Sequence, residues 1–164
     1  MACQGEAPGS AGPLRGRKRD LLEGGVRVPG LLEWPSMVKE GRTVTTPCST
    51  LDYFPTVMDI LGFRMAGQPE PIDGVSLLPI IAGGMPERPV PIAFESRNQV
   101  ALLDNRYKLL STDNGETYQL YDILEDQGEA TDLASRMPDT VAAMKNSLGR
   151  WRASCRASLD GVDY

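Results

Sequence analysis

The spacing of short apolar runs after Pro89 limits most strongly how this chain of 164 residues can fold. The runs cover residues 90–95, 100–103, 106–110 and 117–121. Each is a few residues long and is followed by turn-forming residues, which is typical of strands joined by tight connections. The pair Asp104-Asn105 stands between the second and third runs and predicts the turn of a β-hairpin. We therefore expect a small antiparallel sheet in residues 89–164, with the strand that contains Pro91 at an edge.

A helix is expected to close this sheet. Between Pro138 and about Cys155, apolar residues recur at intervals of three and four, which is the pattern of a helix with one apolar face. The residues on that face are Val141, Met144, Leu148 and Trp151. A small antiparallel sheet followed by a single helix makes this part of the chain an α+β unit.

Residues 13–88 contain fewer regular segments. Helical spacing of the apolar residues predicts a helix that ends at Leu61, because Gly62 follows it. A shorter helix is expected over residues 77–82, before a pair of glycines. The alternation at residues 26–28 predicts a short strand.

The composition excludes several classes of function. The formal net charge is −5, which argues against a general nucleic-acid-binding protein. Histidine is absent, so neither a His-containing catalytic triad nor a His-ligated zinc site can be built from this chain. The three cysteines are far apart and form no CxxC pair, so no zinc site and no disulfide framework is expected. No apolar run is long enough to cross a membrane, and residues 1–12 form a loop or disordered segment without the features of a signal peptide.

Four cations within five residues mark a candidate functional loop. They are Arg15, Arg17, Lys18 and Arg19. A lysine ammonium is a compact charge with three rotatable donors, which suits a tetrahedral oxyanion, and it can stabilise charge that develops on oxygen during ester cleavage. A solvated charged loop is the commoner explanation of such a run, and a nucleic-acid-binding patch is the least favoured one given the net charge. The adjacent Gly24 and Gly25 predict a backbone that turns sharply or lies very close to another segment.

The same stretch carries a family resemblance. Residues 12–29 match the G-x-L-R-G-x-K-x(4)-E-G-G-x-R-V-P segment without a gap and so resemble the sulfatase family. Three further stretches agree with that family: S-T-L-D-Y-F-P-T from Ser49, I-D-G-V-S-L-L-P from Ile72, and Y-D-I-L-E-D from Tyr121 with Gly128-Glu129 after it. Gln127 stands where the family usually has proline. The resemblance covers nearly everything from Gly9 to Tyr164.

The resemblance implies a fold and an activity. The fold is an α/β (alkaline-phosphatase-like) fragment, the C-terminal part of the sulfatase catalytic domain in residues 13–88, followed by a small C-terminal α+β subdomain in residues 89–164. The activity is hydrolysis of sulfate esters by a formylglycine nucleophile, with a calcium ion holding the sulfate. Lys18 matches the family's sulfate-binding lysine and would neutralise charge on the sulfuryl and leaving oxygens. Three residues at neighbouring motif positions are expected to brace this loop and support the substrate pocket: Arg15, Glu23 and Arg27.

Departures from the family pattern limit what this chain is expected to do alone. No C-x-P-S-R motif occurs, and residues 2–7 stand where the family's Asp-Asn metal pair would lie. We therefore assign no metal ligand and no cofactor to this chain, and expect calcium and formylglycine to belong to the missing N-terminal half of the catalytic domain. The chain alone is expected to be inactive towards a sulfate ester substrate. A parallel sheet without its first strands is expected to expose an edge and an apolar face.

Two alternatives to a sulfatase part stay open. One is a non-enzymatic anion- or partner-binding module derived from a sulfatase tail, and the other is part of a related phosphoester hydrolase. No membrane or nucleic-acid partner is expected. Family members are commonly periplasmic, secreted or lysosomal, and the sequence assigns no compartment to this chain.

Overall fold

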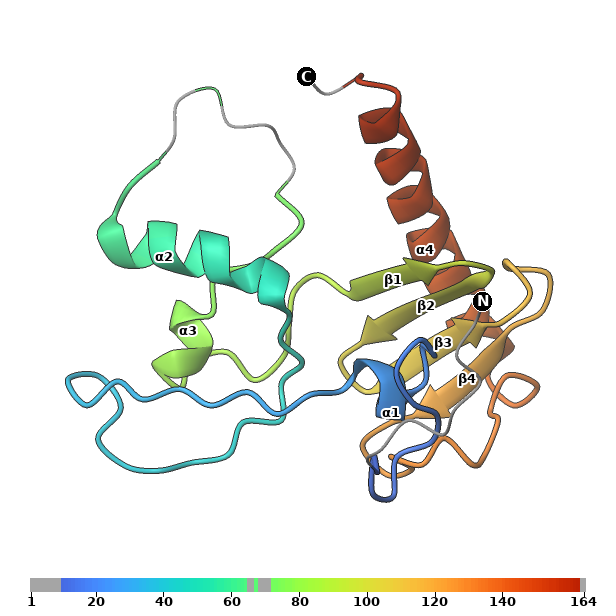
Figure 1. Cartoon of the computed structure of the whole chain (residues 1–164), viewed down its shortest axis with the longest axis horizontal. Helices are drawn as coiled ribbons and strands as arrows, with labels where there is room; N and C mark the ends of the chain where they lie inside the picture. Colours follow the sequence, from blue (N-terminus) through green and yellow to red (C-terminus); the bar gives the residue numbers. More distant parts are fainter. Residues whose placement is uncertain (1–9, 65–66, 68–71, 163–164) are drawn as a thin grey trace, which may run out of the picture.

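An antiparallel sheet of four strands organises the computed structural model, which describes residues 10–64, 67 and 72–162 (Figure 1). The strands are β1 (Ile92–Ser96), β2 (Gln99–Asp104), β3 (Tyr107–Ser111) and β4 (Gln119–Asp122). The helices are α1 (Glu23–Val26), the 3-10 turn η1 (Thr50–Asp52), α2 (Tyr53–Leu61), α3 (Leu78–Ile81) and α4 (Pro138–Leu159). The strands lie side by side in chain order, and every neighbouring pair is antiparallel. The predicted sheet with its closing helix is thus confirmed.

The hairpin between β2 and β3 turns where the sequence predicts it. Asp104 is paired with Tyr107, and Asn105 adopts the left-handed region with a φ of 47°. Asparagine tolerates that conformation better than most residues. The Asn105 side chain also accepts a hydrogen bond from Arg88 N (2.7 Å) and donates one to Arg88 O (3.0 Å). The turn therefore also fixes the segment that leads into β1.

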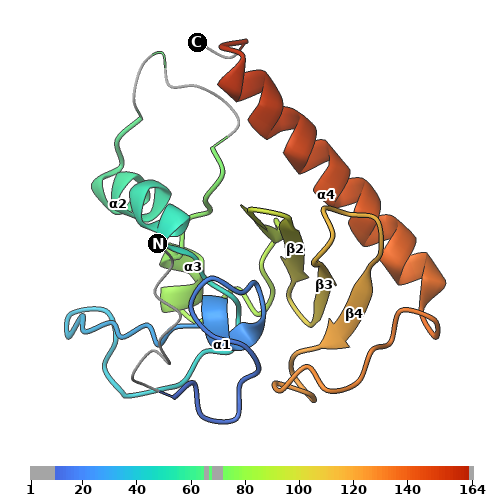
Figure 2. The ribbon, with the colours of Figure 1, turned by 45° about the vertical axis from the view of Figure 1, so that its right-hand side comes forward.

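Both faces of the sheet are buried, each against a different part of the chain (Figure 2). One face packs against α4, and its cluster contains Val100, Leu102, Leu109, Leu120, Met144 and Leu148. The other packs against the segment before α1, and its cluster contains Leu21, Ile92, Ala101, Leu103, Leu110, Tyr121 and Ile123. Because successive side chains of a strand point to opposite faces, β2 supplies alternate residues to the two clusters. The predicted apolar face of α4 is confirmed.

The segment that follows Leu22 differs from the prediction. The short strand expected at residues 26–28 is wrong, because residues 23–26 form the single helical turn α1. Val26 N donates to Leu22 O (3.1 Å) and Arg27 N donates to Glu23 O (2.8 Å). These amides are therefore already bonded within the turn and do not pair with a neighbouring strand.

Helices α2 and α3 form where the sequence indicates. Ser49 and Asp52 make a reciprocal capping box at the start of η1, which leads directly into α2. Gly62 ends α2 in the left-handed region with a φ of 60°. Helix α3 confirms the short helix expected over residues 77–82. None of the helices in the described part of the chain has both the length and the apolar character needed to cross a membrane.

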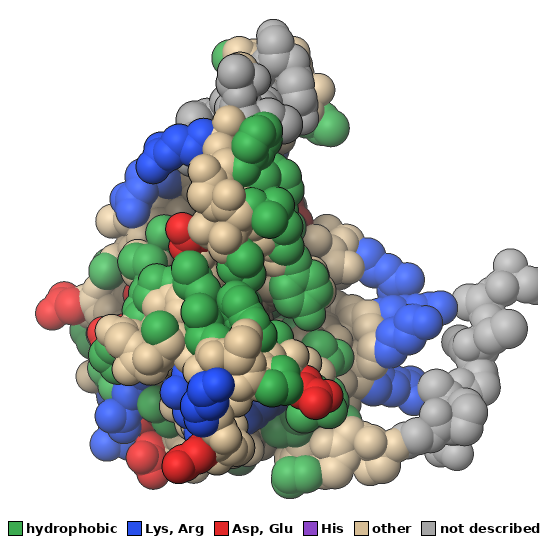
Figure 3. All heavy atoms as spheres, turned by 90° about the vertical axis from the view of Figure 1, so that its left-hand side faces the viewer, with side chains coloured by type: hydrophobic (Ala, Val, Ile, Leu, Met, Phe, Trp, Pro, Cys, Tyr) green, Lys and Arg blue, Asp and Glu red, His purple; other side chains and the backbone are tan. Residues whose placement is uncertain are grey.

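The apolar face of α2 is exposed. The side chains that share it are all at least 44% exposed: Phe54, Val57, Ile60 and Leu61. Hydrophobic side chains cover much of the molecular face seen in Figure 3. The expected parallel sheet is not observed, because β1–β4 form the only sheet of the described residues and it is antiparallel. Part of the exposed apolar surface therefore lies on a helix, and surfaces of this kind mark contacts with another element.

A buried ion pair joins the α2 region to the sheet. Asp52 and Arg88 are 0% and 4% exposed, and the guanidinium binds both carboxylate oxygens at 2.7 Å. The amides of Ser49 (2.6 Å) and Val75 (2.9 Å) also donate to this carboxylate. Burial alone would raise the pKa of Asp52, but the hydrogen bonds from Arg88 and the two amides outweigh it and lower the pKa below the ordinary 3.8.

We expect Asp52→Asn to reduce the free energy of unfolding by about 3 kcal/mol or more, because it leaves the Arg88 guanidinium buried without a counter-charge. Since the pKa of Asp52 is lowered in the folded chain, its stabilising effect is complete above about pH 4 and is lost as the pH falls through the folded-state pKa. Urea unfolding between neutral and acidic pH measures both effects, and the variant should lose part of the acid-dependent decrease.

The matched control is Asp122→Asn, which removes a charge paired at 2.7 Å with the half-exposed Arg106. An exposed pair of this kind contributes under about 1 kcal/mol. Equal losses of stability in the two variants would show that burial of the Asp52 pair is unimportant.

Candidate functional site

The four cations of the candidate functional loop lie within residues 15–20, which we call the cationic loop (Figure 1, dark blue, beside α1). Its C-terminal end is fastened to the sheet. Leu21 is buried in the core and its amide donates to Gln99 Oε1 (3.0 Å), while Gln99 Nε2 donates to Arg19 O (3.3 Å). One side chain at the start of β2 thus holds the end of the loop through two contacts.

Backbone hydrogen bonds close the cationic loop on itself. Gly24 N donates to Arg15 O (2.7 Å), which brings the two flanks of the loop together. Inside the loop, Asp20 N donates to Arg17 O (2.9 Å) and Asp20 Oδ2 accepts from Arg17 N (2.9 Å). Arg19 has a φ of 92°, a conformation that residues other than glycine rarely adopt. A loop with these internal constraints is largely preformed.

The glycine pair after the loop makes a close backbone approach, as the sequence predicts. A Cβ atom on Gly24 would lie 2.7 Å from Arg15 O, and one on Gly25 would lie 2.6 Å from Arg17 O. Carbon and oxygen do not approach so closely without displacement of the backbone. Only glycine at both positions therefore allows α1 to lie against the cationic loop.

Lys18 is exposed at the tip of the loop, between the exposed Arg17 and Arg19. Among the residues that the structure describes, no carboxylate lies within ion-pair distance of these three side chains. Three adjacent cations that form no side-chain ion pair outnumber the single carboxylate of the loop, Asp20, and produce a local positive potential that attracts anions. The loop thus presents Lys18 to solvent from a constrained backbone.

Arg15 contacts the sheet and the segment after β4. Its Nη1 donates to the backbone oxygen of Glu129 (2.9 Å) and to the hydroxyl of Tyr121 (3.4 Å). Burial raises the pKa of the Tyr121 hydroxyl, although the neighbouring Arg15 opposes that increase. Tyr121 is therefore neutral near neutral pH and serves as an acceptor for the guanidinium.

Glu23 is buried in an ion cluster that sequence reasoning did not identify in full. Its Oε1 lies 3.0 Å from Lys108 Nζ, and the same ammonium lies 2.9 Å from Glu129 Oε1. The backbone amide of Glu23 donates to Glu129 Oε2 (2.7 Å). Arg27 approaches the other Glu23 oxygen at 3.7 Å and is about half exposed. We call the three fully enclosed members, Glu23, Lys108 and Glu129, the buried ion cluster.

The four predicted site residues therefore differ in their contacts and in their exposure to solvent. Glu23 and Arg27 form an ion pair, and Arg15 contacts the loop that contains Glu129. Lys18 is exposed and forms no ion pair with a described residue. Lys108 was missed, although its position in β3 gives a signal. It alternates with Leu109 and shares the sheet face of Leu110, so the strand period places its ammonium in the core.

The described residues contain no group of three or more His, Cys, Asp or Glu side chains that could hold a metal ion. The described residues therefore offer no ligand set for the calcium ion that the sulfatase resemblance implies. Cys48 and Cys155 are free thiols, and desolvation of the sulfur by neighbouring atoms raises the pKa of both. Thiols with a raised pKa are protonated near neutral pH and react weakly as nucleophiles.

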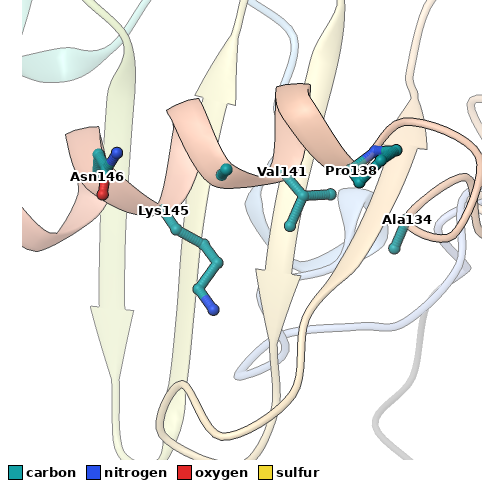
Figure 4. A pocket seen from close by; sticks show the side chains of 6 residues that line it. Ala134, Pro138, Val141, Lys145 and Asn146 are labelled. Atoms are coloured by element: carbon teal, nitrogen blue, oxygen red, sulfur yellow. The ribbon is translucent and has the colours of Figure 1, made fainter.

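A surface hollow of about 440 Å³ lies along α4 and is lined by Ala134, Pro138, Val141, Ala142, Lys145 and Asn146 (Figure 4). Helix α4 covers the sheet face opposite to the one that binds the Leu21 segment. The Lys145 ammonium lies 4.8 Å from the centre of the Tyr118 ring, so this cation is engaged by an aromatic side chain. The hollow is thus separated from the cationic loop by the sheet.

Comparison with known proteins identifies the family. The family model described as "N-sulphoglucosamine sulphohydrolase, C-terminal" matches residues 17–154. The chain belongs to this family of sulfatases. The match includes Lys18, the glycine pair, the sheet and most of α4, and it confirms the resemblance that the sequence motifs indicate.

Individual sulfatases are similar to different lengths of the chain. Steryl-sulfatase of Homo sapiens is 42% identical over 79 residues, which are 46% of this chain and 13% of that protein. A sulfatase of Formosa agariphila is 29% identical over 166 aligned positions, which cover 88% of this chain and 30% of that protein. The crystal structure of Ps i-CgsB in complex with k-i-k-neocarrahexaose matches with a TM-score of 0.75 and 28% identity, over 85% of this chain and 32% of that chain. The fold is therefore that of a sulfatase, and the chain spans about a third or less of the length of these relatives.

We expect Gly24→Ala to displace the cationic loop, because the added Cβ would overlap backbone oxygen atoms of that loop. The amide of Gly24 should lose its protection from hydrogen exchange, since its acceptor is Arg15 O. Amide hydrogen exchange followed by NMR measures this change residue by residue.

The control is Gly149→Ala in α4, where a Cβ would meet nothing within 4 Å. This change should stabilise the chain by about 0.5–1 kcal/mol, because alanine favours a helix interior over glycine. A Gly24→Ala chain whose cationic loop keeps its native exchange rates would contradict the close approach.

Proposed function

We propose that this chain supplies the sulfate-binding lysine, Lys18, to a sulfatase that hydrolyses sulfate esters. The observation that carries the proposal is an exposed ammonium without a counter-charge, presented by a loop that is fastened at both ends. Membership of the sulfatase family and the motif position of Lys18 support it. The substrate would be a sulfate ester, and its alcohol or phenol would be selected by other parts of the enzyme.

The chemistry expected of Lys18 is electrostatic. Sulfate-ester cleavage develops negative charge on the leaving oxygen while the sulfuryl oxygens stay anionic, and an ammonium fixed beside them lowers the energy of that state. The constrained backbone of the loop limits the reorganisation needed when the ester binds. Arg17 and Arg19 would raise the local concentration of anionic substrate through their long-range potential.

The nucleophile and metal would come from elsewhere in the catalytic domain. We propose that the formylglycine and the calcium ligands of the intact enzyme lie in the part of the sulfatase fold that this chain does not cover. In the intact enzyme that part would also cover the exposed apolar face of α2, which includes Phe54 and Val57. This chain would then contribute one wall of the pocket.

A purified sample of the 164-residue chain is expected to show no hydrolysis of p-nitrophenyl sulfate above the buffer rate when calcium is supplied. One cation can bind a sulfate group, but it provides no nucleophile. Release of p-nitrophenol is followed by absorbance, and turnover above background would contradict the assignment of the nucleophile to another segment.

We expect Lys18→Ala to raise the dissociation constant for inorganic sulfate by about tenfold, because charge-assisted hydrogen bonds are the strongest contacts available to this anion. The measurement is an NMR titration of the loop amides with sodium sulfate at constant ionic strength. Lys39→Ala is the charge-matched control, since Lys39 is exposed and its ammonium donates to Pro35 O (3.1 Å) outside the cationic loop. Equal effects of the two substitutions would overturn the role proposed for Lys18.

The three unpaired cations also favour a second candidate, a non-enzymatic module that binds polyanions. Such a module would bind heparin with a strong salt dependence and would lose that binding in Arg17→Ala as well as in Lys18→Ala. A sulfatase part should instead depend mainly on Lys18. Titration with inorganic phosphate in place of sulfate tests the phosphoester alternative in the same experiment.

A further inference from the structure

Glu129 contacts both flanks of the cationic loop. Its backbone oxygen accepts from Arg15 Nη1 (2.9 Å) at the N-terminal flank, and its carboxylate accepts from Glu23 N (2.7 Å) at the C-terminal flank. Lys18 lies between these two points in the chain. A single residue of the segment after β4 therefore spans the base of the loop that presents Lys18.

The Lys108 ammonium makes this contact dependent on charge. It is fully buried between two carboxylates, at 3.0 Å from Glu23 Oε1 and 2.9 Å from Glu129 Oε1. The second contact has the distance of an ion pair but not the angle of a hydrogen bond, so Glu129 Oε1 accepts no hydrogen bond from a described residue. Burying three charges is costly unless they remain together, so separation of the Glu129 carboxylate from the Lys108 ammonium is disfavoured.

The backbone of Glu129 indicates that its side chain is required. Its φ is 51°, in the left-handed region that glycine adopts without a steric penalty. Gly128 directly precedes it, so the chain could meet the same turn with a second glycine. A glutamate held in this conformation therefore points to a role for its carboxylate beyond the turn.

We propose that Lys108 and Glu129 are positioning residues for Lys18. They act through Glu23 and Arg15, fixing both flanks of the cationic loop to the face of the sheet opposite α4. This inference rests on the proposed function, in which Lys18 binds sulfate. It assigns to the C-terminal sheet the task of preorganising the sulfate-binding loop.

The test compares Glu129→Gly and Glu129→Gln with the wild-type chain. The glycine variant removes the carboxylate without adding backbone strain, and the glutamine variant keeps an acceptor for Glu23 N while removing the charge. Glu95→Gln is the matched control, because it removes one carboxylate from a pair with Arg152 at 2.8 Å that lies partly exposed. Each variant is titrated with sodium sulfate at constant ionic strength, and amide exchange is recorded on the same samples.

We expect the sulfate dissociation constant to rise about tenfold in Glu129→Gly, to rise less in Glu129→Gln, and to stay unchanged in Glu95→Gln. Exchange at the amides of Glu23 and Gly24 should accelerate in the glycine variant while the amides of β3 stay protected. If Glu129 only stabilises the fold, exchange in Glu129→Gly should accelerate at all amides together, and the sulfate affinity of the folded fraction should stay unchanged. That result would overturn the proposal.

Two further outcomes keep the two proposals distinguishable. If Lys18→Ala leaves sulfate binding unchanged, the proposed function fails, and the anchoring is then judged by amide exchange alone. If Glu129→Gly does not fold, hydrogen exchange in the wild-type chain still tests the positioning role. The Glu23 amide donates to Glu129 Oε2, so the proposal requires it to exchange as slowly as the amides of β3. Fast exchange of that amide in the wild-type chain would overturn the positioning role.

Discussion

The buried ammonium of Lys108, held between Glu23 and Glu129, is the interaction on which the arrangement of the candidate site depends. It lies on the sheet face that also carries the Leu21 cluster, so apolar packing and ion pairing hold the same segment. Removing the Lys108 ammonium would leave two buried carboxylates without their shared cation, which is strongly destabilising. The position of the cationic loop therefore follows from a few enclosed charges more than from its own exposed residues.

A second buried pair, Asp52 with Arg88, fixes the α2 region to the strand that follows it. The two buried ion pairs lie in regions whose apolar surfaces are covered to different extents. The sheet is covered on both faces by α4 and the Leu21 segment, whereas α2 keeps its apolar face exposed. The part around the sheet carries the candidate anion site, and the exposed apolar face of α2 is a surface of the kind that marks a contact with another element.

The sequence predicts most of the regular structure, because local signals decide it. The Asp104-Asn105 turn, the apolar face of α4 and Gly62 at the end of α2 each act within a few residues, and the structure confirms them. The strand expected at residues 26–28 failed because its alternation is overridden by a helical turn packed on the cationic loop.

The candidate site is only partly predictable. The motif identifies Lys18 and Glu23, but the partners of Glu23 come from β3 and the segment after β4, about 85 and 106 residues away. Contacts over such separations depend on the register of the sheet and on which strand face packs against residues 21–26. The residues around Glu23 determine neither of them. The functional assignment of Lys18 stays a prediction that an anion-binding experiment must test.

The most direct measurement is a crystal structure of the chain with selenate, a sulfate isostere whose anomalous scattering locates it without ambiguity. We expect a selenate peak within about 3 Å of Lys18 Nζ, with the contacts of Glu23, Lys108 and Glu129 unchanged. A selenate bound elsewhere, with Lys18 making no contact and the flanks of the cationic loop separated from Glu129, would contradict this expectation.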